Sequence, residues 1–379
     1  MKNSIIFLFL TIIFFSCNTF QRKEKTEKTL NFSKIETSNI QSVFDFTNSK
    51  LIQLETDSNL RLSDELKTKI SDDNIFIFDY GHNKLFRFSK EGQFINKIGQ
   101  RGRGPEEYLA PGDFIIDKSK QMVEILGEPH TTVTRYTYDG QFVNKMQFKF
   151  PSQSFMKGDN ETYYFYRGVN SASEPYRLTV TDTTKILSNH LKDKGNPGIG
   201  HILEKDAFSS NSNSIFLMES LLPTIYDVSA SEPRKRLTLD YGSKTIDEDA
   251  TSEYSSVMEF FQKITSNGFY SIKDIASSDK KLILKIIYQE KNNPLIFNYL
   301  FYSLDQNSSP HKIQCNEDKN NFLAYTNMHE CFNNYILLTI NPFDILNSDI
   351  SDSFPLHFFN YKELDESDNP IILLMKLKH

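Results

Sequence analysis

The sequence predicts an all-β chain folded as a six-bladed β-propeller, and three observations lead to this prediction. The 379 residues include 18 Tyr and 32 Phe, and aromatic residues pack well on pleated, half-buried surfaces. A unit of short strands around residue 80 returns 48 residues later, so that Gly92 corresponds to Gly140. Weaker copies continue to the end of the chain, and six units can be counted. A period of about 40 to 50 residues made of short strands is typical of propeller blades.

The first blade lies within Ile75–Tyr108, where short apolar strands alternate with turns and lead into a glycine-rich loop. Its hairpin turn Glu91-Gly92-Gln93-Phe94 returns as Asp139-Gly140-Gln141-Phe142. Glycine adopts the positive φ angle that tight hairpins require. We therefore expect the two turns to join equivalent strands of successive blades.

The later blades are expected from their strand patterns. These strands are Glu161–Arg167 and Pro175–Thr181 in blade three, Ser214–Glu219, Pro223–Val228 and Arg234–Tyr241 in blade four, Lys281–Gln289 and Phe297–Asp305 in blade five, and Tyr335–Asn341 and Pro370–Lys378 in blade six. The sixth blade lacks an outer strand, and Lys50–Glu55 near the N-terminus is expected to supply it. Closing the ring in this way removes open strand edges that would favour aggregation.

Two segments interrupt the blade pattern. Asp247–Ser266 predicts a helix inserted between blades four and five, because its apolar residues form one helical stripe. The acidic residues at its start suit the helix dipole. Pro342–Asn369 predicts a long irregular insertion within blade six. The stripe consists of Tyr254, Val257, Phe260, Phe261 and Ile264.

The N-terminus has the layout of a secretory signal. Lys2 precedes an apolar run over Ile5–Phe15, and Ser16-Cys17 follows; the run is too short to span a bilayer. A cysteine after a small residue resembles a bacterial lipobox, in which cleavage before Cys17 is followed by acylation of its thiol. We therefore expect a lipoprotein signal peptide over residues 1–16, a lipidated cysteine with a flexible tether over 17–38, and the propeller over 39–379. Plain secretion and an uncleaved anchor are the alternatives.

Charge and cysteine content narrow the classes of function. The formal net charge is −6, and no basic stripe runs along the chain, so nucleic acid is not an expected partner. Export would permit a disulfide between Cys315 and Cys331. Two free thiols are the alternative, because two cysteines in so long a chain do not form a disulfide framework.

The long connections are all predicted to emerge on one face of the ring, and the other face to carry only tight turns. Functional residues concentrate on long loops held by a rigid scaffold. Arg101 and Arg103 lie in the first of these loops, and their guanidinium groups suit carboxylate, sulfate or phosphate. The alternative is that they pair with Glu106 or Glu107 and lock the blade junction.

Histidines and tyrosines supply further candidate ligand-binding residues. His82 and His130 occupy equivalent loops, and with Glu128 they could suit zinc. Solvated loop histidines are the alternative, and we assign no metal and no cofactor. Tyr80 and Tyr108 could stack against a sugar ring; packing at the blade junction is the alternative.

The chain resembles a known family over roughly residues 40–379. Asp79–Asp117 is similar to an NHL-type repeat, and Gly102-Arg103-Gly104-Pro105-Glu106-Glu107-Tyr108 resembles the G-x-G-P-x-E-Y loop of six-bladed β-propeller lipoproteins common in Bacteroidota. Thr224-Ile225-Tyr226, Leu239-Asp240-Tyr241-Gly242 and Asp368-Asn369-Pro370-Ile371-Ile372 support the resemblance. The resemblance implies the fold and a lipid-anchored place in the cell envelope, and it implies no chemistry.

The sequence therefore predicts a membrane-tethered, extracytoplasmic binding module for a partner protein or a small ligand. Its lipid would attach it to the outer membrane, on either side. The alternative is a propeller enzyme, a lyase or hydrolase with a metal in the axial pore. No G-x-S-x-G, H-E-x-x-H or P-loop motif is present, and we assign no catalytic residue.

Overall fold

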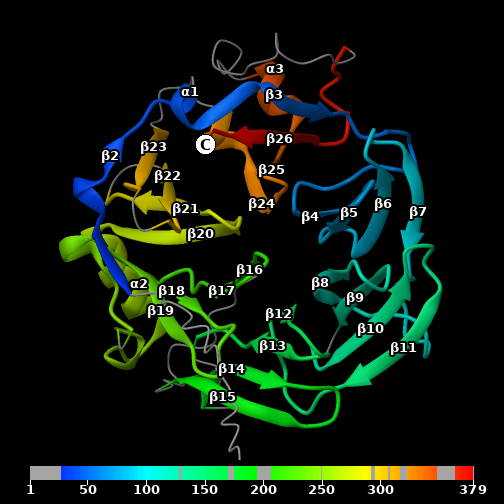
Figure 1. Ribbon diagram of the computed structural model, residues 1–379, viewed down its shortest axis with the longest axis horizontal. Coiled ribbons are helices and arrows are strands. Elements are labelled where there is room, and N and C mark those ends of the chain that lie inside the picture. Colours follow the sequence, from blue (N-terminus) through cyan, green and yellow to red (C-terminus); the bar gives the residue numbers. More distant parts are fainter. Residues whose placement is uncertain are drawn as a thin grey trace, which may run out of the picture.

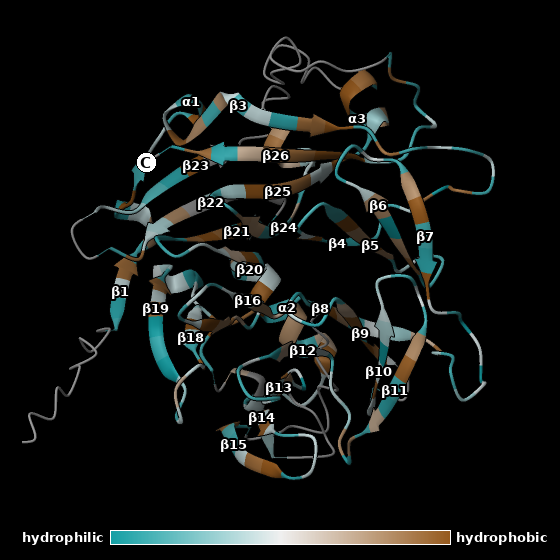
Figure 2. Cartoon of the chain, turned by 45° about the vertical axis from the view of Figure 1, so that its right-hand side comes forward, coloured by the Kyte–Doolittle hydropathy of each residue, from teal (hydrophilic) through white to brown (hydrophobic). Residues whose placement is uncertain are grey.

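The computed structural model is a ring of six blades around a central axis, as the sequence predicts (Figure 1 and Figure 2). Each blade has four antiparallel strands, and two of the blades carry a fifth, parallel strand. It describes residues 27–127, 130–169, 175–193, 206–248, 250–291, 295–305, 308–315, 322–347 and 363–378. In each blade the first strand lies nearest the axis, and the following strands lie successively further out (Figure 1).

The strands of the first three blades follow the sequence without interruption. Blade one contains β4 (Leu66–Ser71), β5 (Asn74–Asp79), β6 (Lys84–Ser89) and β7 (Phe94–Ile98). Blade two contains β8 (Pro111–Asp117), β9 (Met122–Gly127), β10 (Thr132–Thr137) and β11 (Phe142–Gln147). Blade three contains β12 (Ser154–Lys157), β13 (Tyr163–Tyr166), β14 (Tyr176–Thr181) and β15 (Ile186–Lys192).

The last three blades receive strands from the N-terminal segment. Blade four contains β16 (Phe208–Ser210), β17 (Ile215–Leu217), β18 (Thr224–Asp227), β19 (Arg234–Asp240) and β1 (Lys28–Asn31). Blade five contains β20 (Phe269–Ser277), β21 (Lys281–Gln289), β22 (Leu295–Ser303), β23 (His311–Cys315) and β2 (Glu36–Thr37). Blade six contains β24 (Asn327–Phe332), β25 (Tyr335–Ile340), β26 (Ile371–Leu377) and β3 (Phe44–Ile52).

Strand β3 closes the ring, as expected, although it begins earlier than predicted. It pairs antiparallel with β26, from Ile52 opposite Ile372 to Phe44 opposite Leu377. The side-chain amide of Asn369 reinforces the closure by donating to the carbonyl oxygens of Glu55 and Leu60, each at 2.8 Å.

The flexible tether that the sequence predicts over residues 17–38 includes residues that are part of the fold. Lys28–Asn31 and Glu36–Thr37 form short strands that pair in parallel with β19 and β23. The reason is apolar burial: Phe32 is 4% exposed and packs edge-on against Tyr241 and Tyr270. Cys17 lies outside the described residues.

The 48-residue repeat corresponds to a repeated contact between neighbouring blades. Gly92 and Gly140 have φ angles of 89° and 82° and occupy the outer hairpins of blades one and two. Each glycine lies against the end of the outer strand of the preceding blade. A Cβ atom on Gly92 would collide with the carbonyl oxygen of Gln53, and a Cβ atom on Gly140 would collide with that of Lys97. Both hairpins therefore need glycine for its φ angle and for the close approach.

The predicted helix starts later than expected. The helix α2 spans Val257–Asn267, and the acidic residues from Asp247 onward precede it. The Ser256 side chain accepts a hydrogen bond from the backbone N–H of Glu259 at 3.2 Å and sets the helix start. The other α-helices among the described residues are α1 (Ile40–Val43) and α3 (Pro342–Asn347). Within the described part of the chain no helix is long and apolar enough to cross a membrane.

Candidate functional site

The face with the long connections is defined by the antiparallel order of the strands. The β5–β6 and β7–β8 loops, the α2 insertion between β19 and β20, and the α3 insertion between β25 and β26 all leave from this face. We call it the long-loop face. The opposite face carries the short turns, which include the two repeated glycine hairpins.

The loop from Arg101 to Tyr108 on this face is braced by its own carboxylate. Glu107 accepts a hydrogen bond from the backbone N–H of Gly104 at 2.7 Å, and its carboxylate fills the space beside Gly102. The backbone N–H of Gly102 donates to the carbonyl of Tyr108 at 2.9 Å, which joins the two ends of the loop. The loop is therefore held in one shape without help from either arginine.

Arg101 and Arg103 are exposed on this braced loop. The alternative pairing with Glu106 or Glu107 does not occur, because the Glu107 carboxylate is turned toward the Gly104 backbone. Across the residues that the structure describes, neither guanidinium lies within 4.0 Å of a carboxylate. Two positive charges are thus presented to solvent, two residues apart.

Tyr108 packs inside the blade junction, which is the alternative to ligand stacking that the sequence also offers. It is 3% exposed and meets the Tyr136 ring edge-on at 6.2 Å. The Tyr136 hydroxyl donates to the carbonyl of Glu106 at 2.6 Å and ties the loop to blade two. Burial raises the pKa of Tyr108 to about 12, so its hydroxyl stays protonated.

Tyr80 and His130 meet at Gly112, where the chain enters blade two. The Tyr80 hydroxyl donates to the Gly112 carbonyl at 3.3 Å. The His130 ring lies against the same glycine, because a Cβ there would sit 3.2 Å from two ring atoms. Burial and then the charges of Asp206 and Asp113 hold the pKa of Tyr80 well above its usual range.

His82 is engaged in its own loop. Its Nδ1 lies 2.7 Å from the Asp79 carboxylate, which is fully buried and also accepts from the Ser63 hydroxyl at 2.6 Å. Glu128, the expected third ligand of a zinc site, lies outside the described residues. In the described ranges no three His, Cys, Asp or Glu side chains gather closely enough to hold a metal ion.

Polar side chains around the axis bond to the open edges of the innermost strands. The Asp113 carboxylate of blade two accepts from the backbone N–H of Phe155 in blade three at 2.9 Å. The Glu330 carboxylate of blade six accepts from the N–H of Ile70 in blade one at 2.6 Å. The innermost strand of a blade leaves one edge without a neighbouring strand, and buried N–H groups need acceptors. These axial acids therefore have a structural role.

Lys67 is the central cation of this axial group. Its ammonium lies 2.5 Å from Asp113 and also contacts Asp206, while its side chain is only 9% exposed. Burial alone would lower the pKa of Lys67, but the charges of Asp113 and Asp206 raise it above the ordinary value. The sequence analysis did not find Lys67, Asp206 or His329, because no motif distinguishes inner-strand polar residues from exposed ones.

Comparison with known proteins provides the family. A family model described as "Domain of unknown function (DUF4934)" matches residues 24–376. The chain belongs to this family. No curated protein matches the chain.

Two solved structures share the fold of this DUF4934 propeller. A "Putative exported protein" from Bacteroides fragilis NCTC 9343 has a TM-score of 0.70 at 15% identity, covering 93% of this chain and 100% of that chain. A member of the duf4221 family from Bacteroides vulgatus has a TM-score of 0.56 at 10% identity, covering 87% of this chain and 97% of that chain. At these identities the likeness concerns the fold alone.

Cys331 of the DUF4934 propeller has a free thiol, while the side chain of Cys315 lies outside the part of the chain that the structure describes. Burial raises the pKa of this thiol above its usual range. A buried thiol with a raised pKa is a weak nucleophile. Cys331 is therefore a packing residue of blade six.

Proposed function

We propose that this protein is a membrane-tethered, extracytoplasmic β-propeller that binds a partner protein or a small ligand on its long-loop face. The observation that carries the proposal is the braced loop of Arg101 to Tyr108. Its carboxylate Glu107 is used internally, and both guanidinium groups are left exposed without an acidic partner among the described residues. Because the loop backbone is already fixed, binding has to order only the two arginine side chains, which lowers the entropy cost of binding.

The exposed guanidinium groups define which chemical groups the partner must present. Arginine binds carboxylates and phosphates through two parallel hydrogen bonds, so we expect the partner to present anionic groups to Arg101 and Arg103. Tyr80 and His130 lie at the entry to the neighbouring blade and could contribute polar contacts.

The N-terminal sequence supports an extracytoplasmic location, because an apolar run precedes Cys17. The fold is shared with a Bacteroides protein described as exported, which agrees with this location. In the proposal, acylated Cys17 anchors the chain in the outer membrane. A Cys17→Ala variant should leave the membrane fraction, and retention of this variant in membranes would refute the anchor.

Site-specific crosslinking tests the binding face. A photo-crosslinking amino acid is placed at position 106 of the full-length protein in cells, and a matched variant carries it at position 234. Position 106 is exposed in the same loop and leaves both arginines in place. Arg234 is also exposed but starts β19 on the opposite face. We expect a discrete adduct from position 106 and none from position 234. Equal adducts from both positions, or an adduct from position 234 alone, would contradict the proposal.

A further inference from the structure

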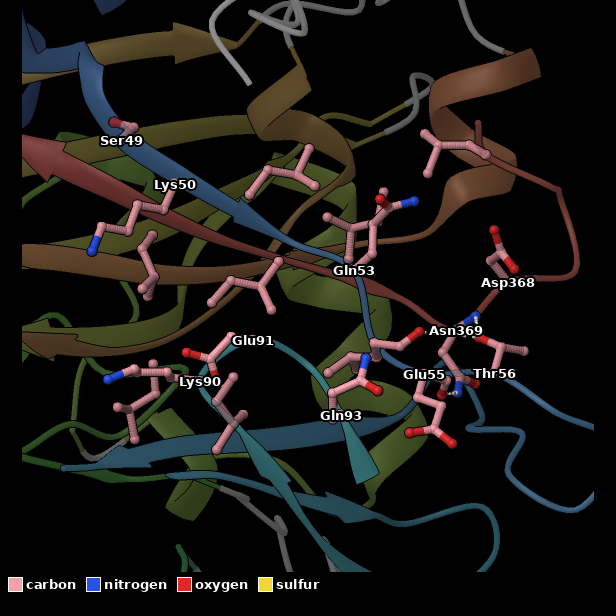
Figure 3. Close-up of a pocket in the computed structure, with 18 of the residues that line it drawn as sticks. Ser49, Lys50, Gln53, Glu55, Thr56, Lys90, Glu91, Gln93, Asp368 and Asn369 are labelled. Carbon is pink, nitrogen blue, oxygen red and sulfur yellow. Dashed lines mark hydrogen bonds between the residues drawn. The ribbon is translucent and has the colours of Figure 1, made fainter. Parts of the chain in front are cut away.

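The seam between blade six and blade one contains a cavity of about 1200 Å³ (Figure 3). Its walls come from β3 and the residues after it, from the β4–β5 and β6–β7 turns of blade one, and from the end of the blade-six insertion. Small-molecule pockets are typically about 300–1,000 Å³. The seam cavity is therefore large enough for a longer, extended ligand.

The cavity has an apolar floor and a polar rim. The floor includes Ile52, Leu54 and Ile70, which belong to the hydrophobic cluster between blades six and one. On the rim, Lys50 and Lys90 lie toward one end and Glu55 and Asp368 toward the other (Figure 3). This arrangement suits a molecule with apolar groups on one side and polar groups on the other.

The charges on the rim favour a neutral or basic ligand. Five carboxylates line the cavity against two lysines, and one of the lysines, Lys90, is already paired with Asp73 at 2.8 Å. An anionic ligand would meet an excess of negative charge, and like charges brought together raise the free energy of binding. The five carboxylates belong to Glu55, Asp72, Glu91, Glu363 and Asp368.

One wall of the cavity includes the end of β3, which among the described residues has a neighbouring strand on one side only. The last four residues of β3, 49–52, line the cavity, and so do the four residues that follow them. The backbone of the following residues is already engaged, because the N–H of Glu55 donates to the Gly92 carbonyl at 2.8 Å, so the edge that remains for pairing is that of β3 itself. In blades four and five the outermost blade strands, β19 and β23, each carry a further parallel strand, β1 or β2. The N-terminal segment of this chain thus already adds a strand to the outer edge of two blades. β3 has no such added strand among the described residues.

We propose that the seam cavity binds an extended peptide of neutral or basic character, which pairs with β3 as an added strand. Backbone hydrogen bonds to the strand edge supply affinity, and alternate side chains enter the pockets beside it. Apolar side chains of the peptide would contact Ile52 and Leu54, and basic ones would face Glu91 and Asp368. The strands β7, β11 and β15 are also last in their sheets, but none of their residues lines this cavity.

The test uses a synthetic peptide with the sequence of residues 28–37, KTLNFSKIET, which carries two lysines and one glutamate. This segment already forms added strands in blades four and five. The full-length protein is titrated with labelled peptide, and backbone amide exchange is followed by mass spectrometry. We expect slower exchange in β3 and no change in β7, β11 and β15.

Charge variants decide whether the seam is the site. The Glu91→Lys, Asp368→Lys double variant should weaken binding about tenfold, and Lys50→Glu should strengthen it. Asp159→Lys changes an exposed carboxylate of a distant turn and should leave the affinity unchanged. In the exchange experiment, the proposal fails if the peptide does not bind, if all open outer strands are protected alike, or if protection is confined to β19 and β23. In the affinity measurements, it fails if none of these seam variants changes the affinity.

Discussion

The carboxylate of Glu107 accepts a 2.7 Å hydrogen bond from the backbone N–H of Gly104, three residues earlier in the same loop. This bond removes the carboxylate from the reach of the neighbouring arginines. It also fixes the loop that carries Arg101 and Arg103, so a single side chain both shapes the loop and leaves its positive charges exposed. The following predictions concern this loop, the axis and the ring closure.

Glu107→Ala should loosen the loop while leaving the propeller folded. The substitution removes the acceptor for the Gly104 N–H, and a hydrogen bond to a charged group contributes about 1.5–3 kcal/mol. We expect faster amide exchange at Gly104 and a small loss of unfolding free energy in urea. Glu106→Ala changes an exposed neighbour and should do neither. Unchanged exchange at Gly104 would show that Glu107 does not hold the loop.

Lys67→Met should strongly destabilise the ring. The Asp113 carboxylate is 1% exposed, and removal of Lys67 leaves it and Asp206 without their cation. Breaking a buried ion pair by removing one partner costs about 3–5 kcal/mol. Lys50→Met, at an exposed position, should change the unfolding free energy by less than about 0.5 kcal/mol. Equal urea midpoints for the two variants would contradict a central role of Lys67.

The stability of the fold should decrease as the pH falls from about 6.5 to about 4, partly because of His329. Burial lowers the pKa of His329 to about 4 from its usual 6.5, although the charge of Asp206 acts in the opposite direction. In this window the unfolded chain binds more protons than the folded one, so acid favours unfolding. His329→Gln should flatten this part of the profile of unfolding free energy against pH. Parallel profiles for the two proteins would exclude His329 as a cause.

Asn369→Ala should weaken the closure between blades six and one. The side chain is 3% exposed. It donates to the carbonyls of Glu55 and Leu60 and accepts from the backbone N–H of Leu62, each at 2.8 Å. Loss of these bonds should cost about 2–4 kcal/mol, since each is worth about 1 kcal/mol and buried partners are left unpaired. Asn347→Ala, at an exposed position, is the control, and equal unfolding free energies of the two variants would contradict this role.

The blade pattern was predictable because each strand carries its own signal. Apolar residues, glycine hairpins and the 48-residue repeat each mark strands and turns over short stretches of the sequence. The six blades and the closure of the ring by β3 can therefore be predicted from these local patterns. The strands β1 and β2 were not predictable, because Lys28–Asn31 and Glu36–Thr37 are polar. Their order comes from Phe32, which becomes buried only when the ring is assembled.

The site was predictable only in part. The exposed arginines lie in a recognisable glycine-rich loop, but the direction of the Glu107 carboxylate depends on backbone geometry that no residue pattern specifies. The sequence left two roles open for Tyr108, because an aromatic residue at the end of a loop can face either the junction or the solvent. The axial group around Lys67 joins residues from separate blades, and its members come together only through the closed ring.

The affinity of the component captured through position 106 tests the central claim most directly. Its dissociation constant is measured with the wild-type protein, with the Arg101→Glu, Arg103→Glu double variant, and with Arg234→Glu as the control on the opposite face. If the braced loop is the binding surface, the double variant should lose at least about tenfold in affinity, or about 1.4 kcal/mol, while the control is unchanged. Equal affinities for the double variant and the wild-type protein would contradict the account.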